Sequence, residues 1–120
     1  MLGRGNHYNN RNRTKYFGFK EGLPEDASNL NFPAYGTEAA RLLVEERGIH
    51  VLGIDAPSID HGPSQNFAVH VLVFEKNVPA LENVAHLEKL PEVGSWIIAM
   101  PRKIDGGSGG PVRIAALLSP

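Results

Sequence analysis

The chain has 120 residues and a formal net charge of −1 at pH 7. A chain of this length forms one domain at most, and its balanced charge provides no general attraction to nucleic acid or to anionic membranes. It has no cysteine and no apolar run long enough to cross a membrane, which excludes disulfides, thiolate chemistry and a membrane span and fits a cytoplasmic protein.

Residues 1–31 predict a partly ordered N-terminal arm and loop. Residues 1–20 are rich in Asn, Arg and Gly and combine basic with aromatic side chains, without an acidic residue. Such a combination is typical of proteins that bind single-stranded nucleic acid, but a frayed arm explains the composition better. We therefore expect no nucleic-acid partner and assign residues 32–120 to the folded domain.

A helix followed by a buried strand is predicted next. Apolar residues recur at helical spacing in Thr37–Arg47, with charged residues on the opposite side. Thr37 is the expected N-cap, and Gly48 is the expected left-handed residue after the helix. The apolar run Ile49–Ile54 predicts a short strand, and a helix leading closely into such a strand indicates the α/β class.

The predicted strand ends at Asp55, where a polar loop with two prolines begins. Functional loops of open α/β sheets gather beyond the carboxyl ends of the strands, so this loop is a candidate wall of a binding pocket. Its candidate substrate-pocket residues are Asp55, Ser58 and His61. A turn in which Asp55 and Ser58 hydrogen-bond the local backbone explains the same residues equally well.

Residues 64–76 fit either a strand or a helix. Their alternation and β-branched content favour a strand buried on both faces. A helix would begin at Ser64 as N-cap and would gather one face from Phe67, His70, Val71 and Phe74. In either structure we expect His70 to point toward the interior.

Three further strands are predicted, at residues 78–81, 95–100 and 112–118, and the second of them is the clearest buried strand of the sequence. The glycine-rich loop Gly106–Pro111 either cradles an anion through its backbone amides or forms a turn that needs positive φ angles. With the earlier strand, these segments predict a small mixed sheet against which one or two helices pack.

Four segments carry a family resemblance: G-I-D-A-P-S-I-D-H-G-P-S, F-A-V-H-V-L-V, V-P-A-L-E-N-V-A-H-L and M-P-R-K-I-D-G-G-S-G-G-P-V-R. In this order they resemble the cyclase family of metal-dependent hydrolases, which includes kynurenine formamidases and isatin hydrolases. The resemblance implies part of a swivelling β/β/α domain and favours the helix at residues 64–76. It also implies an arylformamidase-like hydrolase of formamide or cyclic amide bonds, as in tryptophan catabolism, acting on a small-molecule amide.

The resemblance further implies a zinc or manganese cofactor. In the family a histidine and a glutamate of the matching segments face the metal, and these positions correspond to His70 and Glu82. A neutral imidazole and a carboxylate are suitable ligands for both ions. Judged by residue type alone, a single buried histidine is more often hydrogen-bonded than bound to a metal.

The family's metal-binding motif H-x-T-H-x-D-x-P-x-H has no counterpart in this sequence, whose histidines are His7, His50, His61, His70 and His86. The chain therefore resembles the C-terminal half of a family member, and its status as an enzyme stays open. One expectation is an amide hydrolase that takes its other metal ligands from another chain. The alternative is a truncated, inactive paralogue that binds no metal and acts as an interaction module. Since half a sheet exposes unpaired edges, we expect self-association or pairing with a longer homologue.

Overall fold

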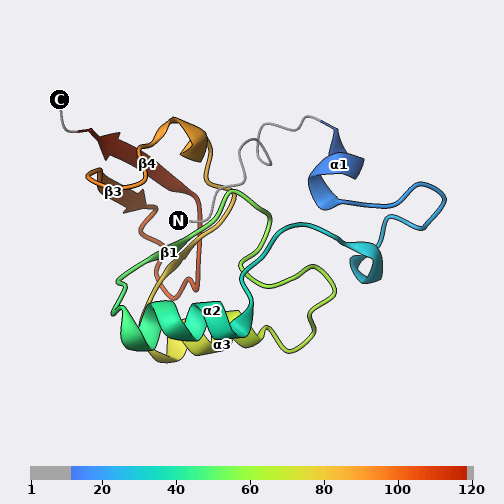
Figure 1. Ribbon diagram of the computed structural model, residues 1–120, viewed down its shortest axis with the longest axis horizontal. Coiled ribbons are helices and arrows are strands. Elements are labelled where there is room, and N and C mark those ends of the chain that lie inside the picture. The colour runs from blue at the N-terminus through green and yellow to red at the C-terminus, as the bar shows by residue number, and fades with distance from the viewer. Residues whose placement is uncertain (1–11, 119–120) are drawn as a thin grey trace. The chain divides into compact units, whose positions relative to one another are not determined.

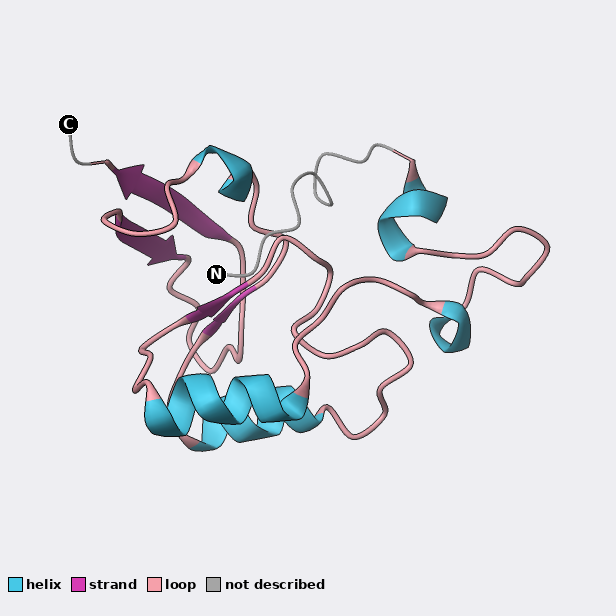
Figure 2. Cartoon of the chain, viewed as in Figure 1, coloured by secondary structure: helices cyan, strands magenta, loops and turns pink. Residues whose placement is uncertain are grey.

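The computed structural model describes residues 12–118, so residues 1–11 of the predicted arm, with His7, lie outside the described part. The chain divides into two compact units, Met1–Glu88 and Lys89–Pro120, which are described separately. The α/β class is confirmed (Figures 1 and 2). None of the helices within residues 12–118 has the length and apolar character needed to span a membrane.

From residue 12 onward, the first unit contains three α-helices, two short strands and single turns of other helix types. In chain order they are α1 (Arg13–Phe17), a 3-10 turn (Ala27–Asn29), α2 (Thr37–Arg41), a π-helical turn (Leu42–Glu46), β1 (Leu52–Gly53), α3 (Ala68–Glu75) and β2 (Ala80–Leu81). A 3-10 turn, Leu87–Lys89, crosses the boundary between the units. The second unit contains β3 (Trp96–Pro101) and β4 (Val112–Leu117).

The helix predicted for residues 37–47 is confirmed as α2 and the π-helical turn that continues it. Gly48 follows with φ +60°, the left-handed conformation that glycine adopts without a steric penalty. The expectation for Thr37 was wrong, because Gly36 occupies the N-cap position and no side chain caps the helix. The Gly36 carbonyl instead accepts the first helical hydrogen bond, from the Ala40 amide.

Residues 68–75 form a helix, α3, as the family resemblance favours and β-propensity does not. Its buried face consists of Val69, Leu72 and Val73. The sequence analysis was wrong about which face of α3 is buried, since Phe67, Val71 and Phe74 are each about half exposed. A helix that is apolar on every side does not indicate by its pattern which face packs.

The N-terminus of α3 also differs from the prediction. Phe67, with φ +46°, holds the N-cap position in place of Ser64. The Ser64 hydroxyl accepts a hydrogen bond from the Phe67 amide instead, at 3.2 Å. Positive φ is unusual for a bulky side chain, so the chain enters α3 through a constrained turn.

β1 and β2 are parallel neighbours joined through α3, the connection that parallel strands require. Leu52 pairs with Ala80 and Gly53 with Leu81. The regular strand is shorter than the predicted Ile49–Ile54, but the pairing continues beyond it, since the Val84 amide donates to the Ile54 carbonyl. The two segments that follow β1 and β2 therefore leave the sheet side by side.

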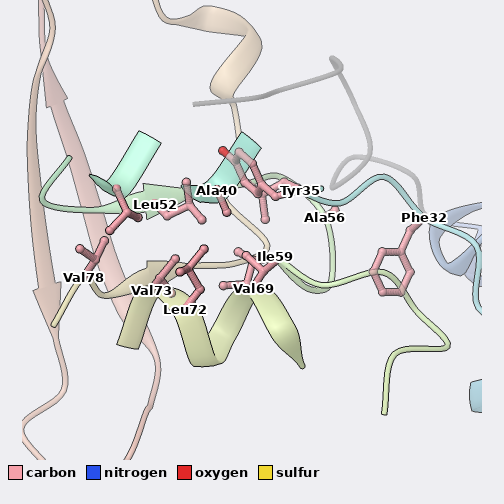
Figure 3. Packing of buried hydrophobic residues seen from close by; sticks show 12 residues of the cluster. Phe32, Tyr35, Ala40, Leu52, Ala56, Ile59, Val69, Leu72, Val73 and Val78 are labelled. Carbon is pink, nitrogen blue, oxygen red and sulfur yellow. The ribbon is translucent and has the colours of Figure 1, made fainter. Parts of the chain in front are cut away.

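The core of the first unit lies between α2, α3 and the β1 strand (Figures 1 and 3). Figure 3 shows Val69, Leu72 and Val73 of α3 facing Leu52 and Ala40. Ile59, from the loop after β1, is fully buried in the same cluster. The loop is thereby anchored in the core, which restricts the positions of the residues on either side of Ile59.

In the second unit β3 and β4 form an antiparallel pair, from Trp96 opposite Leu117 to Pro101 opposite Val112. The strands thus form two separate pairs instead of the single sheet expected. The prediction of a buried strand at residues 95–100 was wrong, because all six residues of β3 are exposed. An apolar run signals burial only where other segments cover it, and pairing with β4 satisfies its backbone without providing that cover.

Candidate metal centre

The candidate site lies where the parallel strands β1 and β2 end. Glu82 follows β2 directly, and residues 55–60 form the loop that follows β1. Because the carboxyl ends of neighbouring parallel strands meet at the same edge of a sheet, these segments come together. His70 lies in the first turn of α3, and its Nε2 atom is 3.2 Å from Oε1 of Glu82.

The loop residues Ser58, Ile59 and Asp60 hold this pair in place. The Ile59 amide donates a hydrogen bond of 2.9 Å to Oε1 of Glu82, the same oxygen that faces His70. The Asp60 amide donates to the Ser58 hydroxyl at 3.1 Å, which closes a local turn. Since the Ile59 side chain is fully buried, the backbone donor for Glu82 is fixed by the core.

Asp60 caps the N-terminus of α3, although it lies in the loop that precedes the helix. Its carboxylate accepts hydrogen bonds from the amides of Val69, at 2.9 Å, and His70, at 3.0 Å. These amides belong to the first turn, where a helix has no carbonyl partners of its own. The second oxygen, Oδ2, also lies 2.7 Å from Nδ1 of His70.

Two opposed effects act on the pKa of Asp60, and the net result lies below its ordinary value. Burial, which leaves the residue 4 % exposed, raises the pKa by itself. The hydrogen bonds from Val69 and His70, with the charge of the His70 ring, outweigh burial and lower it. Asp60 is therefore an ionised acceptor at neutral pH.

His70 lies between two carboxylates and two aromatic rings. Asp60 faces one ring nitrogen and Glu82 the other. Phe67 and Phe74 meet the imidazole edge to face, with centroids 6.0 Å and 5.4 Å away. The His70 side chain is 23 % exposed, so it lies at the surface edge of α3 instead of pointing into the core as expected.

The pair of His70 and Glu82 fits part of a metal site. Two ligands of one tetrahedral zinc ion, each bound at about 2.0–2.2 Å, lie about 3.3 Å apart, close to the 3.2 Å between Nε2 and Oε1. Nitrogen and carboxylate oxygen are also suitable donors for zinc or manganese. Within residues 12–118, however, no three His, Cys, Asp or Glu side chains form a group that could hold a metal ion.

Comparison with known proteins identifies relatives of this chain. No family model matches the sequence. An isatin hydrolase of Roseibium aggregatum is 32 % identical over 100 residues, which are 80 % of this chain and 38 % of the relative. A kynurenine formamidase of Bacillus cereus is 32 % identical over 101 residues, 84 % of this chain and 45 % of the relative. The solved structure of isatin hydrolase A from Ralstonia solanacearum superposes with a TM-score of 0.76 at 30 % identity, covering 88 % of this chain and 40 % of that one.

The chain belongs to the cyclase family. The resemblance inferred from its motifs is thereby confirmed, as is the hydrolase character of its relatives. This cyclase-family chain spans less than half the length of the curated relatives it matches.

The structure brings some of the predicted site residues of this cyclase-family chain together. His70 and Glu82 are in contact, and Ser58 lies in the loop that holds them, with its hydroxyl bonded to the local backbone as the turn alternative requires. Asp55 is buried at the end of β1, and His61 is exposed. The ligand roles of His70 and Glu82 and the pocket roles of the other three stay predictions.

Asp60 is the site residue that the sequence analysis missed. It stands in the middle of the polar loop, and no spacing rule connects it to a histidine of the following helix. The signal was indirect, namely an acidic residue in the segment before a helix, where a negative charge near the N-terminus is favourable. Only the folded loop brings Asp60 to the first turn of α3.

Proposed function

We propose that this chain contributes His70 and Glu82 to the metal site of a hydrolase that cleaves formamide or cyclic amide bonds. The observation that carries the proposal is the 3.2 Å approach of His70 Nε2 and Glu82 Oε1 beyond the parallel strands. Support also comes from the relatives, which are kynurenine formamidases and isatin hydrolases. Zinc and manganese are suitable cofactors for this donor pair.

A divalent cation at this position would supply activated water at neutral pH and would polarise an amide carbonyl. The chain's own residues provide the support. The Ile59 amide orients the Glu82 carboxylate, and Asp60 orients the His70 ring. The rings of Phe67 and Phe74 border the imidazole and limit the access of solvent to it.

Two ligands are too few for a stable site, since catalytic zinc takes three from the protein. The sequence has no H-x-T-H-x-D motif that could supply more. We therefore propose that the remaining ligands lie outside these 120 residues, and that self-association or pairing with a longer homologue supplies them. A small amide substrate would then bind between the two contributions.

One observation favours a second function, that of an inactive interaction module. All six residues of β3 are exposed although most are apolar, which is typical of a surface that binds another protein. In this alternative His70 and Glu82 remain from a hydrolase ancestor, and the pair holds no ion.

Elemental analysis of the purified chain after incubation with zinc or manganese tests the first proposal. We expect bound metal in the wild type, self-associated or mixed with a full-length homologue, and its loss in His70→Ala, since the substitution removes half of the donor pair. His50→Ala is the matched control, because His50 is an exposed histidine away from the pair. A folded wild-type chain that stays metal-free, alone and when mixed with a full-length homologue, would leave the interaction module as the function.

A further inference from the structure

We infer that Asp60 is a positioning residue that keeps the Nε2 lone pair of His70 free for a cation, by holding the ring proton on Nδ1. The inference concerns a residue outside the donor pair and rests on the proposed function for its purpose. The juxtaposition that carries it is Asp60 Oδ2 at 2.7 Å from Nδ1, with Glu82 Oε1 at 3.2 Å from Nε2.

The chemistry of the two carboxylates makes the arrangement directional. An ionised carboxylate only accepts hydrogen bonds, and a neutral imidazole has one donor nitrogen and one acceptor nitrogen. At most one of Asp60 and Glu82 can therefore receive the proton of neutral His70. The contact to Asp60 is shorter by 0.5 Å (3.2 − 2.7), and it lies with the better buried carboxylate, since Asp60 is 5 % and Glu82 31 % exposed.

The alternative tautomer would close the site. With the proton on Nε2, His70 would donate to Glu82, and both members of the donor pair would be occupied with each other. With the proton on Nδ1, two acceptors face each other at 3.2 Å, an arrangement that a cation stabilises. Asp60 thus opposes the one hydrogen bond that competes directly with metal binding.

Asp60 can favour the Nδ1 tautomer of His70 because hydrogen bonds hold both its carboxylate and its backbone. The amides of Val69 and His70 fix its two oxygens, and the Ser58 hydroxyl fixes its backbone. The preceding residue, Ile59, is anchored in the core and donates to Glu82. Two consecutive residues therefore position both members of the donor pair, one through its side chain and the other through its backbone.

Long-range ¹H–¹⁵N NMR of the metal-free full chain tests the inference, with the His70 signals assigned from their loss in His70→Ala. We expect a protonated Nδ1 in the wild type. In Asp60→Asn the side-chain amide can donate to Nδ1, so we expect Nδ1 to lose its proton and Nε2 to gain it. In the same samples the zinc affinity should fall about 10- to 100-fold, the usual effect of losing such a partner of a ligating histidine.

Asp26→Asn is the matched control, because Asp26 also accepts a helix-turn amide through its carboxylate but has no contact to His70. It should leave the His70 signals and the zinc affinity unchanged. An unprotonated Nδ1 in neutral wild-type His70 would overturn the inference, as would an unchanged tautomer in Asp60→Asn. If that variant does not fold, the wild-type spectrum alone decides. Absence of zinc binding in the wild type, alone and when mixed with a full-length homologue, would count against the proposed function, while the tautomer would still decide the role of Asp60.

Discussion

At the scale of single residues, Asp60 connects the stability of the fold to pH. Its folded-state pKa lies below the ordinary value of 3.8, because hydrogen bonds and the His70 charge outweigh its burial. The ionised form therefore stabilises the folded chain fully above the unfolded pKa, and this contribution is lost as the pH falls through the folded pKa. Acid that protonates Asp60 therefore weakens the contact that joins the loop to α3.

We expect the free energy of unfolding of the wild type to decrease as the pH is lowered from about 5 through the unfolded pKa and on through the lower folded-state pKa. Asp60→Asn should be less stable by about 1–3 kcal/mol at neutral pH, and its difference from the wild type should shrink in acid. Urea unfolding at a series of pH values measures both. Glu75→Gln is the control, because it changes an exposed carboxyl on α3, and it should keep a wild-type pH profile. A difference between Asp60→Asn and the wild type that stays constant with pH would contradict this account.

At the scale of elements, α3 is held by one face only. Val73 is fully buried against the core, whereas Val71, two residues earlier on the same helix, is 50 % exposed. Truncating a buried aliphatic side chain loses its transfer free energy and leaves a cavity. The two valines therefore provide a matched pair for testing which face packs.

We expect Val73→Ala to lower the free energy of unfolding by about 2 kcal/mol. Val71→Ala should change it by about 0.5 kcal/mol or less, although both substitutions alter helix propensity equally. Chemical denaturation followed by circular dichroism compares the two variants. Equal losses would mean that the exposed face of α3 is also covered, which would contradict the burial pattern.

At the scale of the whole molecule, the second unit presents an apolar strand without cover. Trp96, Ile98 and Met100 alternate along β3 and so share one face of the strand, with exposed fractions of 77 %, 45 % and 49 %. A two-stranded pair is marginally stable in water by itself. Association through this strand would bury its apolar side chains and pair its free edge.

We expect the purified chain to show a molar mass that rises with concentration in size-exclusion chromatography with light scattering. Ile98→Lys should shift it toward the monomer, because the substitution places a charge in the apolar face. Val93→Lys is the control, since Val93 is 83 % exposed and lies outside β3. A monomeric wild type at high concentration would contradict self-association and leave pairing with a longer homologue as the proposal.

The sequence predicted local structure better than packing. The helix at residues 37–47 and its glycine stop follow from side-chain spacing and from the φ angle that Gly48 tolerates. For residues 64–76 two periodicities compete, and only the family resemblance selected the helix. The burial of β3 was predicted wrongly, because an apolar run does not reveal whether another segment covers it.

For the candidate site, the sequence by itself determined the family and the α/β class and predicted the donor pair, because motifs and residue types are written along the chain. The tertiary structure alone decided that Asp60 joins the pair and that Ile59 positions Glu82. These contacts connect a loop, a helix and a strand end, so their geometry depends on how β1, α3 and β2 pack. Periodicity describes neighbours along one element, whereas the site is assembled from three.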